Sequence, residues 1–218
     1  MNATPHSAAP RPGSRAGRLP QIAGVLALDF CNSSSGRCGA HHLEHFCWPG
    51  DILAWAEHAA LLTATQRERA ARLLRPGDAA RLLQDAVALR EAIHAAADAL
   101  ATGRAPGSES LARVLSIHAG ALATARLEPG AESYRLAWDP AQALLPAVLG
   151  PIAQSAVKLL LESDLGRVKR CGGPDCGWLF FDQTKNGKRR WCEMSVCGNR
   201  AKQRRLRQRV LAAGTPAG

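Results

Sequence analysis

Apolar residues between positions 78 and 102 recur every three or four residues along the chain. On a predicted helix these residues lie along one stripe, which we expect to be buried. The stripe comprises Leu82, Leu83, Ala86, Leu89, Ile93, Ala97 and Leu100. Similar spacing and capping signals predict shorter helices over residues 51–61, 65–75 and 110–122. A longer helix is expected over 140–165, with a kink at Gly150 and Pro151.

Two other segments alternate between apolar and polar residues, a period of two that is typical of β-strands. The first flanks Glu128-Pro129-Gly130 and predicts a β-hairpin over residues 125–138. The second runs from 178 to 182 and is followed by the turn signal Asn186-Gly187, so we expect it to pair with a return strand over 188–192.

An arginine-rich segment follows and is predicted to be helical over residues 200–211, with Asn199 as its N-cap. Together these elements predict a mainly α fold with a small β-hairpin, in which a helical N-terminal domain precedes a C-terminal ββα-type finger. The composition changes after Gly166 to Cys, aromatic and basic residues, so we place the domain boundary between 19–165 and 166–211.

Four cysteines in the C-terminal segment have a symmetric spacing, with four residues inside each pair and fifteen between the pairs: Cys171, Cys176, Cys192 and Cys197. Two short pairs separated by an insert of hairpin length can bring four thiolates into a tetrahedron around Zn²⁺. Disulfides are the alternative, but the chain has 7 cysteines, an odd number, and paired thiols in a reducing compartment bind metal more often than each other. Since sulfur would fill all four coordination positions, we predict one structural zinc ion that stabilises the finger.

The charge of the chain is concentrated in the same segment. Residues 167–209 hold 13 of the 28 Lys and Arg residues but only 3 of the 18 acidic residues, so the whole formal net charge of +10 belongs to this segment. Like charges repel unless a polyanion lies against them, and nucleic acid is the expected partner. A solvated surface and a membrane-surface helix are the alternatives, and the second lacks a broad apolar face. We predict contacts with duplex DNA through Lys188, Arg189, Arg190, Arg200, Lys202, Arg204, Arg205, Arg207 and Arg209.

The first eighteen residues are rich in Pro, Gly, Ala and Arg and contain no apolar core of a signal peptide. We therefore expect a disordered leader over residues 1–18 and a cytoplasmic protein. The most apolar stretch, residues 141–161, is interrupted by Pro146, Gly150, Pro151, Gln154 and Lys158. These interruptions favour a buried helix over a lipid-facing one, so no membrane partner is expected.

A cluster of metal-binding residue types lies upstream and comprises Cys31, Cys38, His41, His42, His45 and Cys47. No second pair with regular spacing accompanies Cys38 and His41, so a second metal site is the weaker interpretation. A ligand pocket is the stronger one: Asp29 and Asn32 end an apolar run, and a small acidic effector could meet Arg37, His41 and His42 there. Helix capping or loop hydrogen bonds by Asp29 and Asn32 are the alternative.

The run Cys197-Gly198-Asn199-Arg200 and the surrounding CGWLFFD and RRWC segments resemble the bacterial CGNR zinc finger family across residues 169–202. The upstream half is similar to the N-terminal ABATE-like domain of that family, described as a stress-induced transcription regulator. This similarity lies in the LALDFCN run at 26–32, the helix start at 51–55 and the LREAI run at 89–93. The resemblance implies a DNA-binding regulator whose cysteines hold zinc at the four positions named above.

We therefore expect a cytoplasmic transcription regulator that binds DNA through the finger and senses a small-molecule effector through residues 19–165. A homodimer would suit palindromic DNA sites, although no heptad pattern indicates one. An RNA-binding or ribonucleoprotein-interaction module is one alternative, because Trp178, Phe181 or Trp191 could stack on unpaired bases. An enzyme acting through the upstream domain is the other, but no Gly-rich phosphate loop, nucleophile elbow or HExxH run occurs, and no catalytic residue is predicted.

Overall fold

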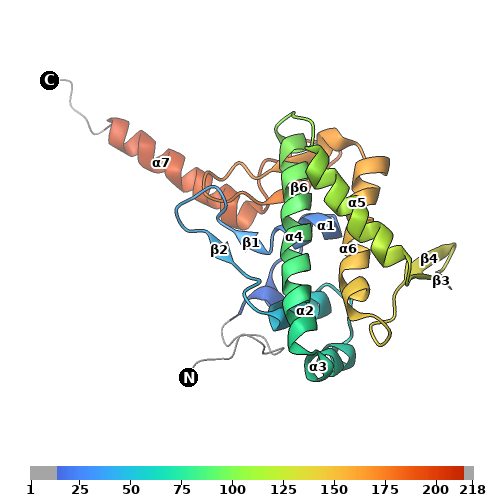
Figure 1. Ribbon diagram of the computed structural model, residues 1–218. Coiled ribbons are helices and arrows are strands. Elements are labelled where there is room, and N and C mark those ends of the chain that lie inside the picture. Colours follow the sequence, from blue (N-terminus) through green and yellow to red (C-terminus); the bar gives the residue numbers. More distant parts are fainter. Residues whose placement is uncertain (1–13, 214–218) are drawn as a thin grey trace, which may run out of the picture.

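A computed structural model describes residues 14–213, with side chains as far as residue 210, and helices account for most of it (Figure 1). The α-helices are α1 (Leu26–Cys31), α2 (Pro49–His58), α3 (Ala64–Leu73), α4 (Pro76–Ala101), α5 (Ser108–Leu122), α6 (Leu144–Glu162) and α7 (Asn199–Ala213). Short strands form three antiparallel pairs: β1 (Ser34–Ser35) with β2 (Leu43–Glu44), β3 (Arg126–Pro129) with β4 (Tyr134–Ala137), and β5 (Val168–Arg170) with β6 (Leu179–Phe181). Shorter helical turns are η1 (Ala16–Arg18), η2 (Leu165–Arg167) and the π-helical η3 (Met194–Gly198).

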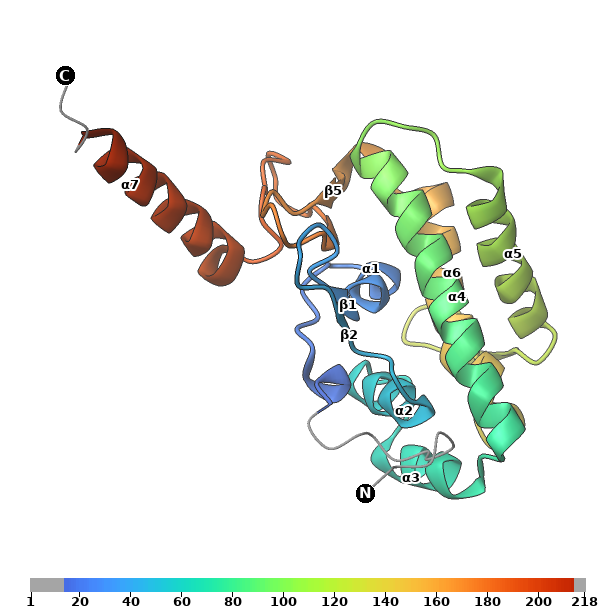
Figure 2. The same cartoon turned by 60° about the vertical axis from the view of Figure 1, so that its left-hand side comes forward.

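The fold is mainly α, as the sequence predicted, and the long helix α4 lies at its centre. It packs against α5 and α6 on one side and against α1 and α2 on the other (Figure 2). Neighbouring helices add Trp55 from α2 and Ile152 from α6 to the same core. The stripe predicted from the helical period is largely inside, since the buried residues of α4 include Leu82, Ala86, Leu89, Ile93 and Ala97.

Three aromatic rings meet in this core. The ring centroid of Phe30 lies 5.5 Å from that of Phe46 and 5.0 Å from that of Trp55, and the Phe46 and Trp55 centroids are 6.2 Å apart. Tilted and edge-to-face pairs contribute roughly 0.5–1.5 kcal/mol each beyond the burial of their area. The cluster therefore joins α1 and α2 to the segment that connects them.

One charged side chain, that of Arg90, is buried beside these rings with only 2% of its surface exposed. Its guanidinium donates to both carboxylate oxygens of Glu44, at 2.6 and 2.5 Å, and to Glu91 at 2.9 Å. Glu91 in turn accepts two hydrogen bonds from Arg37, at 2.8 and 2.7 Å. Because Arg37 and Glu44 belong to the segment around β1 and β2, this network holds that segment against α4.

The C-terminal finger is packed on the helices. A second hydrophobic cluster combines Leu28 of α1, Ala97 of α4 and Leu159 of α6 with Leu179 and Phe180 of β6. Three of the four predicted zinc ligands belong to this cluster as well. The finger therefore buries its apolar side chains with the help of the upstream helices.

The starts of the predicted helices differ by a few residues from those observed. α3 follows Thr63, whose hydroxyl accepts the Gln66 N–H, and not Thr65 as predicted. Asp51 does cap α2, but from inside its first turn, where the carboxylate accepts backbone N–H groups from the two residues before the helix. Local capping signals thus predicted the right helices, but the predicted first residues lie about two positions after the observed ones.

The predicted end of α4 and the predicted hairpin are confirmed. Gly103 follows α4 with a φ of +71°, a left-handed conformation that ends the helix. β3 and β4 pair with Arg126 opposite Ala137. The next helix begins only at Leu144, because the backbone carbonyl of Asp139 accepts two N–H groups and forms a turn first.

α6 is the one helix within residues 14–213 that is long and apolar enough to cross a membrane, judged by length and composition alone. Pro151 lies inside it, as expected. Its buried residues divide between the two hydrophobic clusters, with Val148 and Ile152 in the first and Leu159 in the second. The apolar character of α6 is therefore used in packing against other helices and the finger.

The predicted pairing of the finger strands is wrong. β6 pairs with β5, so that Val168 lies opposite Phe181, and not with residues 188–192. The other edge of β6 is already used, because Phe181 N–H donates to Ala23 O at 2.8 Å and the Asn32 side chain bonds both backbone groups of Leu179. Upstream residues thus occupy the position that a return strand would need.

The predicted N-cap of α7 is also wrong. The π-helical η3 runs into α7 without a break, so the helix needs no cap at Asn199. The Asn199 side-chain amide instead donates backwards to Ser195 O at 2.9 Å.

Most of the predicted leader, residues 1–13, lies outside the described residues. From residue 14 onward the chain differs from the prediction, because it forms η1, in which Ala16 is fully buried. Small residues allow η1 to lie close to α2, since a Cβ added at Gly17 would lie 3.4 Å from the Ala54 Cβ of α2.

Replacing Arg90 with alanine should lower the free energy of unfolding by about 3–5 kcal/mol, because it removes a buried side chain and leaves the carboxylates of Glu44 and Glu91 without its hydrogen bonds. Urea unfolding followed by circular dichroism measures this change. The matched control is Arg81→Ala, whose side chain is 73% exposed and pairs with Asp85, and it should cost less than about 1 kcal/mol. Equal losses in the two variants would contradict the role assigned to Arg90.

Candidate metal centre and nucleic-acid interface

The four cysteines converge on one point. The Sγ atoms of Cys171, Cys176, Cys192 and Cys197 all lie within 4.8 Å of one another. Two separations are 3.7 Å, between Cys176 and Cys192, and 3.6 Å, between Cys192 and Cys197. Zn–S bonds of about 2.3 Å in a regular tetrahedron place neighbouring sulfurs about 3.8 Å apart. The cluster therefore fits one zinc ion with sulfur in every coordination position.

A short loop after β5 positions the first pair of cysteines. Cys171 N–H donates to Trp178 O at 2.8 Å and closes the loop, inside which Cys176 N–H donates to Gly173 O at 3.1 Å. A Cβ at Gly173 would lie only 3.2 Å from the Cys176 Cβ, so a side chain there would push the loop away from the sulfurs. Glycine at this position lets the backbone approach the metal site closely.

The second pair spans the start of the C-terminal helix. Cys192 precedes η3, and Cys197 lies within it and donates its N–H to Glu193 O at 2.9 Å. The wider turn of a π-helix occurs often at functional sites. Since η3 continues into α7, the metal ligand Cys197 stands three residues before Arg200, and the metal centre sets the direction in which α7 leaves the finger.

The thiols strongly influence one another's ionisation. Hydrogen bonds from the thiols of Cys176 and Cys192 lower the pKa of Cys171, and donation to that thiolate raises the pKa of both donors. Burial raises the pKa of Cys197. A divalent cation at the centre removes this conflict, because it stabilises all four thiolates together.

Asn32 and Asp29, two of the predicted effector residues, are buried and bonded to the protein. The Asn32 amide donates to Leu179 O at 2.9 Å and its side-chain oxygen accepts Leu179 N–H at 3.0 Å, so it pairs with β6 as a strand would. Asp29 accepts Ala23 N–H at 2.9 Å. Burial raises the pKa of Asp29 to about 6, and backbone hydrogen bonds and the charge of Arg189 oppose this rise. These contacts match the alternative of loop hydrogen bonding, and those of Asn32 join the end of α1 to the finger.

The other predicted effector residues lie in different surroundings. Arg37 is held by Glu91, and His42 Nε2 lies 2.6 Å from Ser34 Oγ. His41 is exposed and lines a cavity of about 470 Å³ between the β1–β2 segment and the finger. Among residues 14–210, the only group of three or more metal-ligand side chains is the cysteine tetrad, so the stretch 31–47 holds no second one.

Asp182 organises the loop between the two cysteine pairs, a role that sequence reasoning missed. It is fully buried and accepts hydrogen bonds from Lys169 Nζ at 2.8 Å, Thr184 Oγ1 at 2.6 Å and Arg189 N–H at 2.8 Å. Burial alone would raise its pKa, but these bonds hold the pKa of Asp182 well below its ordinary value. The sequence did contain a signal for this role, because Asp182 is one of only 3 acidic residues among the basic residues of the segment.

Arg189, a predicted phosphate contact, uses its donors inside the protein. Its guanidinium donates to Trp191 O at 3.0 Å, to Ile22 O at 3.0 Å and to Cys192 O. It also lies over the Phe180 ring, 4.3 Å from the centroid. Arg189 therefore connects the metal loop to the N-terminal segment, whereas its neighbours Lys188 and Arg190 are exposed.

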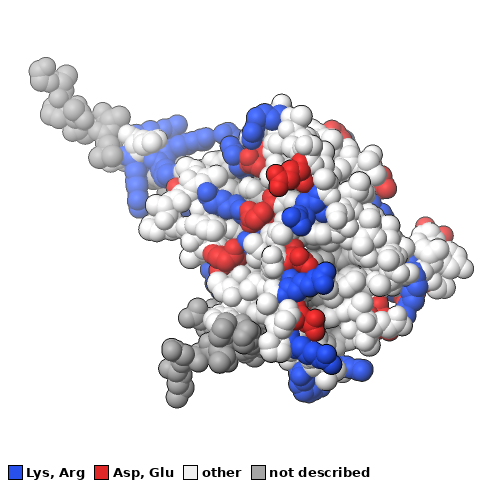
Figure 3. All heavy atoms as spheres, in the orientation of Figure 1, with Lys and Arg blue, Asp and Glu red and all other residues white. Residues whose placement is uncertain are grey.

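The remaining predicted DNA contacts lie on α7. Residues 199–210 contain six basic residues and no acidic one. Five of the six are exposed, and Arg204 is partly buried. None of them forms an ion pair with any side chain in residues 14–210. Figure 3 shows the positive side chains gathered on this projecting helix, whereas both signs alternate over the body of the molecule.

Two family models match the chain. The CGNR zinc finger matches residues 167–210, and ABATE, described as "Putative stress-induced transcription regulator", matches residues 24–163. No curated protein matches it. The first match contains the cysteine tetrad and the basic residues of α7, and the second contains α1 to α6.

Removing zinc should destabilise the upstream helices as well as the finger, because three ligands lie in a cluster shared with α1, α4 and α6. Cys192→Ser should lose the stoichiometric zinc and lower the thermal midpoint of the helical circular dichroism signal by at least about 10 °C. The exposed Cys38 supplies the control: Cys38→Ser should keep one zinc per chain and the original midpoint. Undiminished zinc in Cys192→Ser would refute the ligand set.

Asp29 should make folding less favourable as the pH rises from about 4 to about 6. Its folded pKa of about 6 exceeds the ordinary value of 3.8, so over this range the folded state holds a proton that the unfolded state releases. Asp29→Asn should remove this loss, and its stability relative to the parent protein should rise across the window by up to about 3 kcal/mol. Urea unfolding at pH 4.5, 5.5 and 7 measures the difference, and a constant difference would disprove the raised pKa.

Proposed function

The chain belongs to the ABATE family and also carries a CGNR zinc finger, and we propose that it is a transcription regulator that binds duplex DNA through α7. The two family descriptions together give it a regulatory role that involves nucleic acid. Both are regulator or zinc finger types, and we propose no catalytic activity. One observation carries the more specific proposal, namely the exposed, entirely basic charge of α7.

The arrangement of side chains around α7 supports insertion into a groove. By helical spacing, Arg200, Arg204 and Arg207 share one flank, and Lys202, Arg205 and Arg209 share the opposite flank. A helix in the major groove, which is about 12 Å wide, has a phosphate backbone on each side. Two basic flanks therefore suit the two DNA strands, and α7, with 15 residues, extends about 22 Å along them.

The ridge between these flanks supplies candidates for contacts with bases. It consists of Gln203, Leu206 and Val210, which face away from Ala201, the one buried residue among positions 199–210 of α7. Leu206 and Val210 are each 63% exposed. Glutamine can pair with adenine, and apolar side chains can contact the thymine methyl group. We assign base recognition to this ridge and phosphate contacts to the flanks, with Lys188 and Arg190 as further phosphate contacts from the finger loop.

Zinc supports this function by fixing the helix and takes no part in the recognition itself. All four coordination positions are filled by sulfur, which leaves none for a base or a phosphate. We further propose that the upstream helices sense a small-molecule effector and that the regulator works in the cytoplasm. A homodimer stays a prediction.

Binding to duplex DNA should weaken steeply with salt, and Arg207→Ala should flatten the slope of log affinity against log salt by about 0.9, the value of one phosphate contact. Gln203→Ala should lower affinity for the preferred sequence and leave the slope unchanged. Fluorescence anisotropy with a labelled duplex at several salt concentrations measures both.

The control for this experiment is Arg113→Ala, which removes an exposed arginine from α5 and should change neither affinity nor slope. Single-stranded DNA and RNA of the same length should bind more weakly than the duplex. Tighter binding of RNA would favour the ribonucleoprotein alternative, but Trp178 and Trp191 are both partly buried, and Trp178 Nε1 is bonded to Ser35 Oγ at 3.2 Å.

A further inference from the structure

A cavity of about 720 Å³ lies at the end of the helical unit opposite the finger. It is bounded by α3, by the first turns of α4 and by residues 139–146, which lead into α6. Figures 1 and 2 both place α3 at the end of α4 that is remote from the finger. A volume of this size is typical of sites for small organic ligands.

The helix α3, which forms one wall, has polar anchors in its first half, and Ala70 and Ala71 in its second half pack against the main hydrophobic core. Arg67 Nε lies 2.6 Å from the Glu57 carboxylate of α2, and Thr63 and Gln66 form a reciprocal capping box. No residue of α3 is buried, and Leu73 in its last turn is 66% exposed. An amphipathic helix usually fills the space below its apolar face. Here the space below the last turn of α3 is the cavity.

The floor of the cavity is apolar. Leu82 of α4 is buried at the bottom of the site, and Leu144 and Leu145 of α6 line it and are partly buried. Leu73 and Leu74 add apolar surface from the α3 side. This lining favours a ligand with a hydrocarbon or aromatic body.

The rim of the cavity has an excess of positive charge. Arg69 and Arg75 are exposed there, and neither forms an ion pair with a side chain in residues 14–210. Two other charged groups on the rim are already paired, since Arg81 contacts Asp85 at 3.4 Å and Asp139 contacts Arg126 at 3.9 Å. The one remaining acid on the rim is Asp78. Two guanidinium groups against one carboxylate favour an anionic head group.

We propose that this cavity binds a small organic anion with an apolar body, and that its occupancy is transmitted to the finger through α4 and α6. Only the second clause rests on the proposed function. Both helices connect the two places: α4 has Leu82 at the cavity and Ala97 in the finger cluster, and α6 has Leu144 at the cavity and Leu159 in the finger cluster. The 26 residues of α4 extend about 39 Å, and packed helices shift as units.

The cavity of about 470 Å³ beside the finger is less suited to an anion. Arg15, Arg200 and Arg204 line it, but so do Asp175 and Glu193. Four thiolates around Zn²⁺ add a net charge of about −2 at its wall. The arginines there are therefore offset by neighbouring negative charge, unlike Arg69 and Arg75.

The test uses two fluorescent probes of similar shape, 1-anilinonaphthalene-8-sulfonate, which is an anion, and N-phenyl-1-naphthylamine, which is neutral. Arg75→Ala should weaken binding of the anionic probe about fivefold and leave binding of the neutral probe unchanged. Leu73→Ser should weaken both probes. Both substitutions leave α7 intact, so any probe bound by its arginines contributes equally to every measurement.

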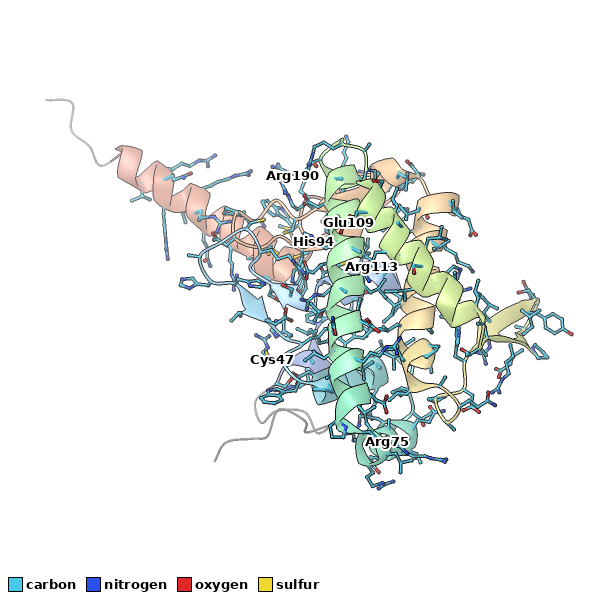
Figure 4. The ribbon with its side chains drawn as sticks, viewed as in Figure 1. Cys47, Arg75, His94, Glu109, Arg113 and Arg190 are labelled. Atoms are coloured by element: carbon cyan, nitrogen blue, oxygen red, sulfur yellow. The ribbon has the colours of Figure 1, made fainter. Side chains whose placement is uncertain are left out.

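Matched controls are available on α5 and α6. Figure 4 shows Arg113 on α5, far from Arg75 at the junction of α3 and α4, and Leu161 of α6 is 78% exposed and does not line the cavity. Arg113→Ala and Leu161→Ser should leave both probes unaffected. Binding that is unchanged in Arg75→Ala and Leu73→Ser, or weakened equally in the controls, would overturn the site.

Transmission to the finger is tested by measuring duplex DNA affinity with and without anionic probe, at a probe concentration equal to its dissociation constant for the parent protein. The ratio of the two affinities should lie further from one in the parent protein than in Arg75→Ala, because coupling between two sites requires occupancy of the first and the variant is then less occupied. Equal ratios would overturn the transmission and leave the site standing. A chain that binds no DNA but keeps the Arg75-dependent probe binding would refute the proposed function and support the site.

Discussion

Four sulfur atoms gathered around one cation are the constraint on which the finger depends. The segment that contains β5, β6 and η3 has too few apolar residues to fold alone, and segments of roughly forty residues usually need a metal or a disulfide. The tetrad closes both of its loops and also supplies three buried side chains to the cluster shared with α1, α4 and α6. One local bonding arrangement thus determines the fold of the finger, its attachment to the helices and the origin of α7.

Features with a short-range cause could be predicted from the sequence. The zinc ligands follow from their spacing, and the buried stripe of α4 follows from the helical period. Features that require segments distant in sequence could not be. The pairing of β6 depends on Ala23 and Asn32, about 150 residues upstream, and the buried pair of Arg90 with Glu44 joins residues 46 apart. The cavity below α3 is assembled from three separate segments and likewise has no local signal.

The basic residues of the finger illustrate how neighbours decide the role of one residue type. Arg189 and Lys169 belong to the same positive segment as Arg205, yet both are bonded within the protein. Arg189 donates to backbone carbonyls of the finger and of the N-terminal segment, and Lys169 donates to Asp182. Arg205 is exposed. Net charge therefore predicts an interface only at the level of the whole segment, and it does not separate the arginines that hold the finger together from those available to a partner.

The continuous passage from η3 into α7 has a consequence for how such proteins can vary. Cys197 is held by the metal and Arg200 follows it within one unbroken helix, so the angular position of every later side chain is counted from the cysteine. One inserted residue in between would rotate both basic flanks by about 100° and advance them by about 1.5 Å. Length is therefore constrained between the ligand and the first arginine, whereas added turns beyond residue 213 would leave the register of the helix intact.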